Sequence, residues 1–273
     1  MQQFEIDYAK MIYDVMTKGV EKTGRNGVTR SIFGMSLVIE DVSKYFPIIQ
    51  GRKMYIKGIL GEFAALIRQP KHLDDFTKWG CNYWSKWANA DGSINVDYGN
   101  AWFDMQGFNQ IAHLKHLLAT SPNDRRMIVS GWRPWAIADL SLPCCHYSYQ
   151  FNVSEGRLNM VWTQRSLDLM IGTPSDIVLA AVWLITLANE FGLVPGRIKM
   201  DFGDCHVYEE HFEAAEKYLS RVRLNESLNS HFQPVSYALL MLPGQDFCTF
   251  EPDELAFTTP YLSFEAIPLE LKA

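Results

Sequence analysis

Apolar side chains recur every three or four positions at the start of the chain, which is the spacing of an amphipathic helix. Phe4, Tyr8, Met11 and Val15 form this repeat, and Gly19 follows it as a stop signal. We therefore predict a first helix over residues 4–18. Helices are also predicted over residues 54–67, 73–87, 105–118 and 209–221.

The strongest helix signal lies between Thr173 and Phe191. The segment opens with Thr-Pro-Ser-Asp, and a proline is tolerated in the first turn because its missing N–H has no helical partner there. Gly192 follows as the stop.

Runs rich in β-branched and aromatic residues predict strands over 31–39, 127–130, 146–153, 158–164, 198–202 and 234–240. The segment SEGR (154–157) joins the third and fourth runs as a hairpin, and residues 92–98 form a turn into a loop. Strands and helices interleave without a regular βαβ repeat. We therefore predict an α+β fold with a mixed central sheet flanked by helices, in a single domain over residues 1–273.

The composition of the 273-residue chain is that of a soluble globular protein, with 48% apolar and 21% charged residues. A net charge of −6 argues against a protein that coats nucleic acid, because such proteins need a basic face. There is no signal-peptide core and no run of about 18 apolar residues. We expect a cytoplasmic protein, in the host cytoplasm if it is viral, with no membrane and no stable nucleic-acid partner.

The cysteines form no CxxC pair and have no histidine at zinc-ligand spacing, so neither a disulfide framework nor a metal site is predicted. In a reducing compartment each is most simply a small buried apolar residue. The five cysteines are Cys81, Cys144, Cys145, Cys205 and Cys248.

Two adjacent cysteines stand directly before a histidine and a predicted strand, in the segment LPCCHYSYQF (142–151). By itself this is a weak signal, since a buried cysteine and a core histidine are each more often structural. Other distinctive segments accompany it along the chain. They are SIFG (31–34), YWSKWANADGSINVDYGNAW (83–102), NDRRMIVSGW (123–132), QRSLDLMIGTPSDI (164–177) and DFGDCHVYEEH (201–211).

In this order and at this spacing, the segments resemble the thymidylate synthase family across nearly the whole chain. The resemblance implies the fold of that family and a homodimer. It also implies a folate-dependent enzyme that adds one carbon to C5 of a pyrimidine nucleotide, with 5,10-methylenetetrahydrofolate as the cosubstrate.

The resemblance assigns the nucleophile to Cys145, which matches the cysteine of the family's PCH motif and is followed by His146. A thiolate that adds to C6 of the pyrimidine makes C5 nucleophilic, and thiolate is the reactive form of cysteine. Tyr98 matches the tyrosine associated with loss of the C5 proton. Glu62 matches the acidic residue that organises water and proton transfer, and a buried helix glutamate is otherwise disfavoured unless it is paired.

The ligand-binding residues follow from the same resemblance. Arg125 and Arg126 match an arginine pair that reaches the phosphate of the neighbouring subunit, and guanidinium groups suit a phosphate dianion. The family's N-terminal phosphate arginine has a different spacing here, so either Lys22 or Arg25 is expected in that role. Further substrate contacts are implied for Gln164, Arg165, Ser166, His206 and Tyr208, the last two at the sugar 3′-hydroxyl. Folate contacts are implied for Arg52, Trp84, Trp87, Asp168 and Gly172.

Asp176 departs from the family pattern, in which an asparagine usually reads the N3–H and O4 of uracil, and Ser175 replaces the usual aromatic residue. Cytosine instead presents a 4-amino donor and an N3 acceptor. An aspartate accepts from the amino group with one oxygen and shares a proton with N3 through the other, which also activates C6. In this respect the chain resembles the family's deoxycytidylate-modifying members, as in phages that modify their DNA.

A simpler interpretation is that Asp176 is favourable in the first turn of a helix, where its charge meets the helix dipole. That explains why aspartate is tolerated but not why the uracil-reading amide is lost. We therefore favour dCMP over dUMP as the substrate and count Asp176 among the catalytic residues. Deoxyribose and ribose stay open.

The product is 5-methyl-dCMP or 5-hydroxymethyl-dCMP, depending on whether hydride or water reaches the exocyclic methylene group. Trp84, Trp87 and a C-terminal IPLELKA segment that folds over the site favour a dry pocket and the methyl product. The segment does not match the family's usual C-terminus closely, so the hydroxymethyl product stays open.

Two rival hypotheses are kept. One is an ordinary thymidylate synthase that methylates dUMP and tolerates Asp176. The other is a non-catalytic nucleotide-binding or RNA-binding regulator on the same fold. The joint presence of Cys145, Tyr98, Glu62 and Arg165, together with the acidic net charge, disfavours the regulator.

Overall fold

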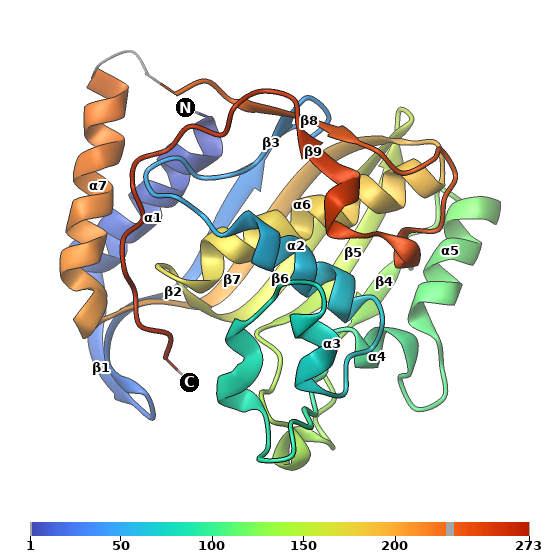
Figure 1. Ribbon diagram of the computed structural model, residues 1–273, viewed down its shortest axis with the longest axis horizontal. Helices are drawn as coiled ribbons and strands as arrows, with labels where there is room; N and C mark the ends of the chain where they lie inside the picture. The colour runs from blue at the N-terminus through green and yellow to red at the C-terminus, as the bar shows by residue number, and fades with distance from the viewer. Residues whose placement is uncertain (1, 228–231, 273) are drawn as a thin grey trace.

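The central sheet has six strands among the described residues, in the order β1-β2-β7-β6-β5-β4 (Figure 1). A computed structural model of the protein describes residues 2–227 and 232–272. The strands are β1 (Val20–Gly24), β2 (Gly27–Ile39), β4 (Ile128–Ser130), β5 (His146–Ser154), β6 (Arg157–Asp168) and β7 (Val194–Tyr208).

Strands β6 and β7 run parallel, whereas every other described pair in this sheet is antiparallel. Parallel neighbours need a crossover connection, and helix α6 (Gly172–Glu190) provides it. This helix is apolar on nearly all sides and packs against both strands. Its length and hydropathy would suit a membrane span, but 83% of that apolar window is buried inside the protein, as in a core helix.

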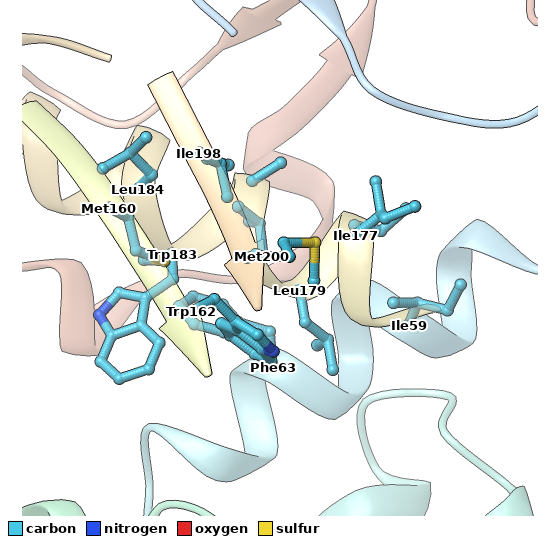
Figure 2. Close-up of a cluster of buried hydrophobic side chains, with 14 of the residues drawn as sticks. Ile59, Phe63, Met160, Trp162, Ile177, Leu179, Trp183, Leu184, Ile198 and Met200 are labelled. Atoms are coloured by element: carbon cyan, nitrogen blue, oxygen red, sulfur yellow. The ribbon is translucent and has the colours of Figure 1, made fainter. Parts of the chain in front are cut away.

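The main core lies between α6 and the sheet (Figure 2). Figure 2 shows Trp183 and Leu184 of α6 close to Met160 and Trp162 of β6 and to Met200 of β7. Side chains alternate along a strand, so every second residue of β6 faces the helix and is buried. This alternation holds from Leu158 to Gln164, and Leu167 is the next buried residue of the strand.

Helix α2 (Ile56–Leu66) packs over α6 and closes the core on the side away from the sheet. Helix α1 (Gln3–Lys18) packs on β2 and on α7 (Phe212–Ser227), and α5 (Gln110–Thr120) lies beside β4. A smaller sheet has the order β3-β8-β9, from β3 (Tyr45–Phe46), β8 (Val235–Leu239) and β9 (Leu255–Phe257). Short elements complete the described chain: α3 (Leu73–Thr77), η1 (Tyr83–Trp87), α4 (Asn100–Phe103), η2 (Ile137–Asp139), η3 (Glu209–His211), η4 (Phe247–Thr249) and η5 (Pro252–Glu254).

The predicted α+β fold with a mixed sheet is confirmed, but the single helix predicted over residues 73–87 is wrong. That segment forms α3 and the 3₁₀ helix η1, separated by a loop in which Gly80 has φ +84°. A left-handed residue cannot continue a right-handed helix, and glycine adopts it at little cost. The aromatic residues of η1 are thereby free to point toward α2.

Helix α5 begins later than the predicted start at residue 105. Gln106 and Gly107 both have positive φ and form a turn, and Asn109 then caps the helix by accepting from the N–H of Ala112. The helix predicted over 209–221 is present as η3 followed by α7.

The predicted hairpin between β5 and β6 is confirmed, with Glu155 and Gly156 at φ 51° and 71° in its turn. Strand β1 was not predicted, because all of its residues are exposed and carry no apolar alternation. Strand β7 is longer than the predicted 198–202, since its second half carries polar residues. The remaining predicted strands are present with shifted ends.

Leu184→Ala tests how much the packing of this core contributes to the stability of the protein. Leu184 is fully buried in α6, so its truncation removes apolar contacts and leaves a cavity. We expect the free energy of unfolding to fall by about 2–5 kcal/mol. Leu242→Ala is the matched control, because Leu242 is 72% exposed and its loss should cost less than about 0.5 kcal/mol. Urea unfolding followed by circular dichroism measures both, and equal losses would contradict this placement of the core.

Candidate active site

A cavity of about 560 Å³ lies at the carboxyl ends of the parallel strands β6 and β7. Side chains from both strand ends line it, together with residues of α2, η1 and the start of α6. Ligand sites commonly form at this edge of parallel strands, because loops and side chains of distant segments converge there. The last residues of the chain form part of its wall.

Most residues that the sequence analysis assigned to a site line this cavity. The group predicted to be catalytic is there in full: Cys145, Glu62, Tyr98, His146 and Asp176. The predicted ligand-binding residues found there are Arg25, Arg52, Trp84, Trp87, Gln164, Arg165, Ser166, Asp168, Gly172, His206 and Tyr208. Three predicted residues do not line it: Lys22, Arg125 and Arg126.

Cys145 stands directly before β5, and hydrogen bonds fix its backbone. Its N–H donates to the hydroxyl of Tyr98 at 2.5 Å, and its carbonyl accepts from the N–H of Arg165 at 2.9 Å. Burial raises the pKa of the Cys145 thiol, while the charge of Arg165 and the Tyr98 hydroxyl act to lower it. Arg165 is therefore the nearby group that favours the thiolate over the thiol.

The neighbouring Cys144 points away from the cavity. It is fully buried, its thiol donates to the carbonyl of Gly131 at 3.4 Å, and burial raises its pKa to about 12. The guanidinium of Arg165 donates to the carbonyls of Cys144 at 2.9 Å and Pro143 at 3.0 Å. Of the two adjacent cysteines, only Cys145 is placed to meet a ligand.

The rings of Tyr98 and His146 pack beside the cysteine with their centroids 4.5 Å apart and their planes tilted by 47°. Burial lowers the pKa of His146 to about 3, so the imidazole is neutral at physiological pH. Tyr149 donates its hydroxyl hydrogen to the His146 carbonyl at 3.0 Å, which leaves Nδ1 of His146 to donate to the Tyr149 oxygen at 2.5 Å. The neutral ring therefore holds its hydrogen on Nδ1.

Glu62 projects from α2 into the cavity with both carboxyl oxygens hydrogen-bonded. Tyr83 donates to Oε2 at 2.6 Å and the indole N–H of Trp84 donates to Oε1 at 2.8 Å. Burial raises the pKa of Glu62 to about 7, although both hydrogen bonds act to lower it. Tyr83 was missed by the sequence analysis, where its place in the segment YWSKW, next to Trp84, was the available signal.

Asp176 lies in the first turns of α6, buried against the end of β6. Its Oδ2 accepts from Nε2 of Gln164 at 2.8 Å. Burial raises the pKa of Asp176 to about 8, opposed by the Gln164 hydrogen bond and increased by the nearby carboxylates of Glu62 and Asp168. Near neutral pH, this carboxyl group is therefore placed to give up or accept a proton.

The two alternatives for the N-terminal phosphate residue differ in position. Arg25, in the turn between β1 and β2, lines the cavity, whereas Lys22 forms a salt bridge of 2.9 Å with Asp204. His206 at the end of β7 contacts the same carboxylate, with Nδ1 3.2 Å from Oδ1. Its ring meets that of Tyr208 edge-on at 5.1 Å.

Arg125 and Arg126 lie outside the cavity of their own subunit. The Arg126 side chain is 83% exposed and pairs with Asp124 at 2.5 Å, which lowers the pKa of that carboxyl to about 2. Gln150 of β5 bonds only the backbone carbonyl of Arg125, at 3.4 Å. Neither guanidinium takes part in building the cavity.

A comparison with protein families matches the model described as thymidylate synthase to residues 6–258. The chain belongs to the thymidylate synthase family. Its activity is accordingly folate-dependent transfer of a one-carbon group to C5 of a pyrimidine nucleotide. The mixed central sheet flanked by helices is the fold of this family.

The side of the cavity toward α2 fits the folate cosubstrate that the thymidylate synthase family uses. The ring centroids of Trp84 and Trp87 lie 5.3 Å apart there. The carboxylate of Asp168 accepts from the N–H groups of Met170 at 2.8 Å and Ile171 at 3.2 Å. The indole nitrogen of Trp87 is buried without a hydrogen-bond partner among the described residues. Aromatic faces beside a fixed carboxylate suit a flat heterocycle with N–H groups at its edge.

Arg52 stands at the same side of the cavity. Its guanidinium donates to the carbonyl of Met170 at 2.6 Å, and its Nε is buried without a partner among the described residues. A fixed cation at the rim fits the carboxylates of a folate tail. These residues would hold the cosubstrate by stacking, by hydrogen bonds and by charge.

The C-terminal segment (Figure 1, dark red) lines part of the cavity. The carbonyl of Leu271 accepts from Lys86 at 2.6 Å, and that of Glu270 lies 3.0 Å from Nε2 of His211. Lys272 forms a salt bridge of 2.7 Å with Glu210. Ala273, the last residue of the predicted IPLELKA lid, lies outside the described residues.

Tyr83→Phe tests whether the hydrogen bond from Tyr83 lowers the pKa of Glu62. The substitution removes one of the two hydrogen bonds that lower the pKa of Glu62, so that pKa should rise by about one unit. If the carboxylate is the working form, the acidic limb of the kcat profile moves to higher pH by the same amount. Tyr55→Phe is the control, because Tyr55 also lines the cavity but donates to the carbonyl of Gly80. Superimposable profiles for wild type and Tyr83→Phe would contradict this role.

Proposed function

We propose that this member of the thymidylate synthase family acts on dCMP, with 5,10-methylenetetrahydrofolate as the one-carbon donor. The observation that carries the proposal is the buried carboxyl of Asp176, at a position where an amide would read uracil. Its Oδ2 is occupied by Gln164, so Oδ1 is the oxygen available to a base in the cavity.

The Watson–Crick edge of cytosine suits such a group better than that of uracil. The 4-amino group of cytosine donates, and a carboxyl oxygen accepts. N3 of cytosine accepts, and the raised pKa of Asp176, about 8, supports a carboxyl that carries a proton for it at neutral pH. Uracil offers the opposite pattern, a donor at N3 and an acceptor at O4, and the ionised form of Asp176 would leave O4 facing an oxygen that cannot donate.

The chain supplies the groups for the covalent step in this proposal. The Cys145 thiolate, favoured by Arg165, forms a bond to C6 of the ring. The displaced electron pair moves through C4 to N3, where the carboxyl of Asp176 delivers its proton. C5 is then nucleophilic and attacks the methylene carbon of bound methylenetetrahydrofolate, as one of the two carbon–nitrogen bonds of that carbon breaks. Tyr98 and water remove the C5 proton, and Tyr98 is held beside Cys145 by the 2.5 Å hydrogen bond. Loss of this proton expels tetrahydrofolate as the second carbon–nitrogen bond breaks. Hydride from tetrahydrofolate then converts the exocyclic methylene group to methyl, the bond between Cys145 and C6 breaks, and dihydrofolate is left.

Methyl is the proposed product, because the C-terminal segment lines the cavity that holds the reacting groups. Ile267 and Leu269 add apolar side chains to the wall on this side, and a closed apolar wall excludes the water that would give hydroxymethyl. The three links of the segment to Lys86, His211 and Glu210 support the closed arrangement.

A homodimer is also part of the proposal. One face of the sheet carries Phe33, which is 79% exposed on β2, and Ile128 of β4 is also exposed. Burying such side chains against a second copy is favourable. The exposed Arg125 and Arg126 would then reach the phosphate site of the partner subunit, where Arg25 and Arg165 already provide positive charge. A cytoplasmic location is proposed with it.

Tritium release from 5-³H-dCMP and 5-³H-dUMP, with methylenetetrahydrofolate present, tests the choice of base. We expect faster release from dCMP, with dihydrofolate formed in step if the product is methyl. Asp176→Asn should shift the dCMP-to-dUMP ratio of kcat/KM toward dUMP by at least about tenfold, because a hydrogen bond of the wrong polarity costs roughly 1.4 kcal/mol or more. Asp74→Asn, at an exposed carboxyl, is the control.

Two results would change this assignment. Release from dUMP alone by the wild-type protein would identify an ordinary thymidylate synthase. Release from dCMP without dihydrofolate would identify hydroxymethylation instead of methylation.

Subunit complementation tests the shared site. Cys145→Ala and the double variant Arg125→Ala/Arg126→Ala should each be nearly inactive as homodimers. After mixing and subunit exchange, about half of the dimers are mixed, and one of the two sites in each mixed dimer has both its cysteine and the partner's arginines. We expect recovery of about a quarter of wild-type activity in a random mixture. Complete exchange without recovered activity would contradict arginine donation across the interface.

A further inference from the structure

We propose that Gln164 is a specificity-determining positioning residue, which fixes the atom that residue 176 turns toward the nucleotide base. The inference rests on the proposed function, in which residue 176 reads the base. It adds that Gln164 fixes which side-chain atom of residue 176 faces the base. Trp162 and the carbonyl of Ser166 in turn hold Gln164.

The side chains of Trp162, Gln164 and Asp176 form a series of hydrogen bonds along the buried face of β6 and into α6. Trp162 and Gln164 lie two residues apart, so both face α6, and their exposed fractions are 1% and 3%. The indole N–H of Trp162 donates to Oε1 of Gln164 at 3.2 Å. Nε2 of Gln164 donates to the Ser166 carbonyl at 3.1 Å and to Oδ2 of Asp176 at 2.8 Å.

These partners leave only one orientation for the Gln164 amide. An indole nitrogen only donates, so the atom that meets Trp162 must be the oxygen. A backbone carbonyl only accepts, so the atom that meets Ser166 must be the NH₂ group. The ring of Trp162 is itself fixed by packing, 4.3 Å from His146 and 4.9 Å from Tyr149.

Gln164 consequently reaches a ligand through residue 176. Both hydrogens of its amide nitrogen are already engaged, one with Ser166 and one with Asp176. Although Gln164 lines the cavity, it has no further N–H to offer a base. This differs from the direct substrate contact that the sequence analysis implied for it.

The side chain at 176 must therefore accept a hydrogen bond at the atom facing Gln164. Aspartate does so with Oδ2 and presents Oδ1 to the cavity, where this oxygen accepts from the amino group of cytosine and carries the proton shared with N3. Asparagine would have to accept with its only oxygen, so its NH₂ group would face the cavity as a donor. One arrangement of Gln164 thus gives an acceptor for cytosine with aspartate and a donor for uracil O4 with asparagine.

Replacing Gln164 by glutamate should reverse the orientation of an asparagine at 176. A buried glutamate at 164 would be protonated, because burial disfavours the charged form. Its carbonyl oxygen would accept from Trp162, and its hydroxyl would donate to the Ser166 carbonyl. The hydroxyl oxygen would then accept from the NH₂ group at 176, which turns the asparagine oxygen toward the base.

The experiment measures Kd for dCMP and dUMP in a Cys145→Ala background, where binding is free of the covalent step. Asp176→Asn alone should shift the ratio of the two constants toward dUMP by about tenfold or more. Adding Gln164→Glu should move the ratio back toward dCMP by a similar factor. Gln110→Glu is the matched control, because Gln110 is also buried but does not line the cavity. Its amide nitrogen donates to the Ser130 carbonyl at 2.8 Å, and its amide oxygen accepts from the Ser130 N–H at 2.9 Å.

The outcomes separate the two proposals. If Asp176→Asn leaves the ratio unchanged, residue 176 does not read the base, and the proposed function and this inference both fail. If Asp176→Asn shifts the ratio but Gln164→Glu added to it does no more than Gln110→Glu, the orienting role of Gln164 is overturned while the role of Asp176 stands. If the wild-type protein prefers dUMP, only the assignment of dCMP as the substrate fails. The orienting role of Gln164 would still be supported if adding Gln164→Glu to Asp176→Asn moves the ratio of the two Kd values back toward dCMP.

Discussion

The parallel pairing of β6 with β7 is the constraint on which the site depends. In its register Ser166 pairs with Asp204 and Asp168 pairs with His206, so polar residues from distant parts of the chain end at one edge of the sheet. The crossover helix α6 that this pairing requires begins at the same edge and brings Asp176 there. Had the two strands been antiparallel, these groups would lie at opposite ends of the sheet.

Burial of acidic groups around one cavity follows from that geometry. Glu62 and Asp176 both lie in apolar surroundings, and burial raises their pKa values to about 7 and about 8. The protein limits the cost by giving each a neutral donor, Tyr83 and Trp84 for the first and Gln164 for the second. Carboxyl groups poised near neutral pH are what a reaction with several proton transfers needs.

The ionisation of the Cys145 thiol depends on a similar balance between burial and nearby charged groups. Burial favours the thiol, Arg165 favours the thiolate, and the carboxylates of Asp176 and Asp168 oppose ionisation. A proton moved from Asp176 to the base would leave a negative charge near the sulfur as the sulfur loses its own. The C-terminal segment adds Ile267 and Leu269 to the wall of the same cavity, and apolar surroundings strengthen each of these electrostatic interactions.

Much of this arrangement was predictable from the sequence. The long helix after Thr173 and the hairpin at 154–157 carry strong local signals, and both are present. Strand β1 gave no signal because its side chains are all exposed. Most predicted site residues lie around one cavity. The different positions of Arg25, in the cavity wall, and Lys22, paired with Asp204, depend on tertiary contacts that the sequence does not show.

The hydrogen bonds around the two buried acids could not be predicted either. Tyr83 reaches Glu62 only because Gly80 interrupts the expected helix, and Gln164 is known as an orienting residue only once Trp162 and Asp176 are placed beside it. Such contacts depend on the directions in which side chains leave different elements. A sequence pattern does not specify those directions.

Mass spectrometry of the protein incubated with methylenetetrahydrofolate and either 5-fluoro-dCMP or 5-fluoro-dUMP would show whether Cys145 attacks the base and which base it prefers. Fluorine at C5 cannot leave as a proton does, so the covalent complex is trapped after addition to C6. We expect a stable adduct of nucleotide and folate on the peptide containing Cys145, formed faster with 5-fluoro-dCMP, and no adduct with Cys145→Ala. An adduct formed only with 5-fluoro-dUMP, or one located on another residue, would contradict this expectation.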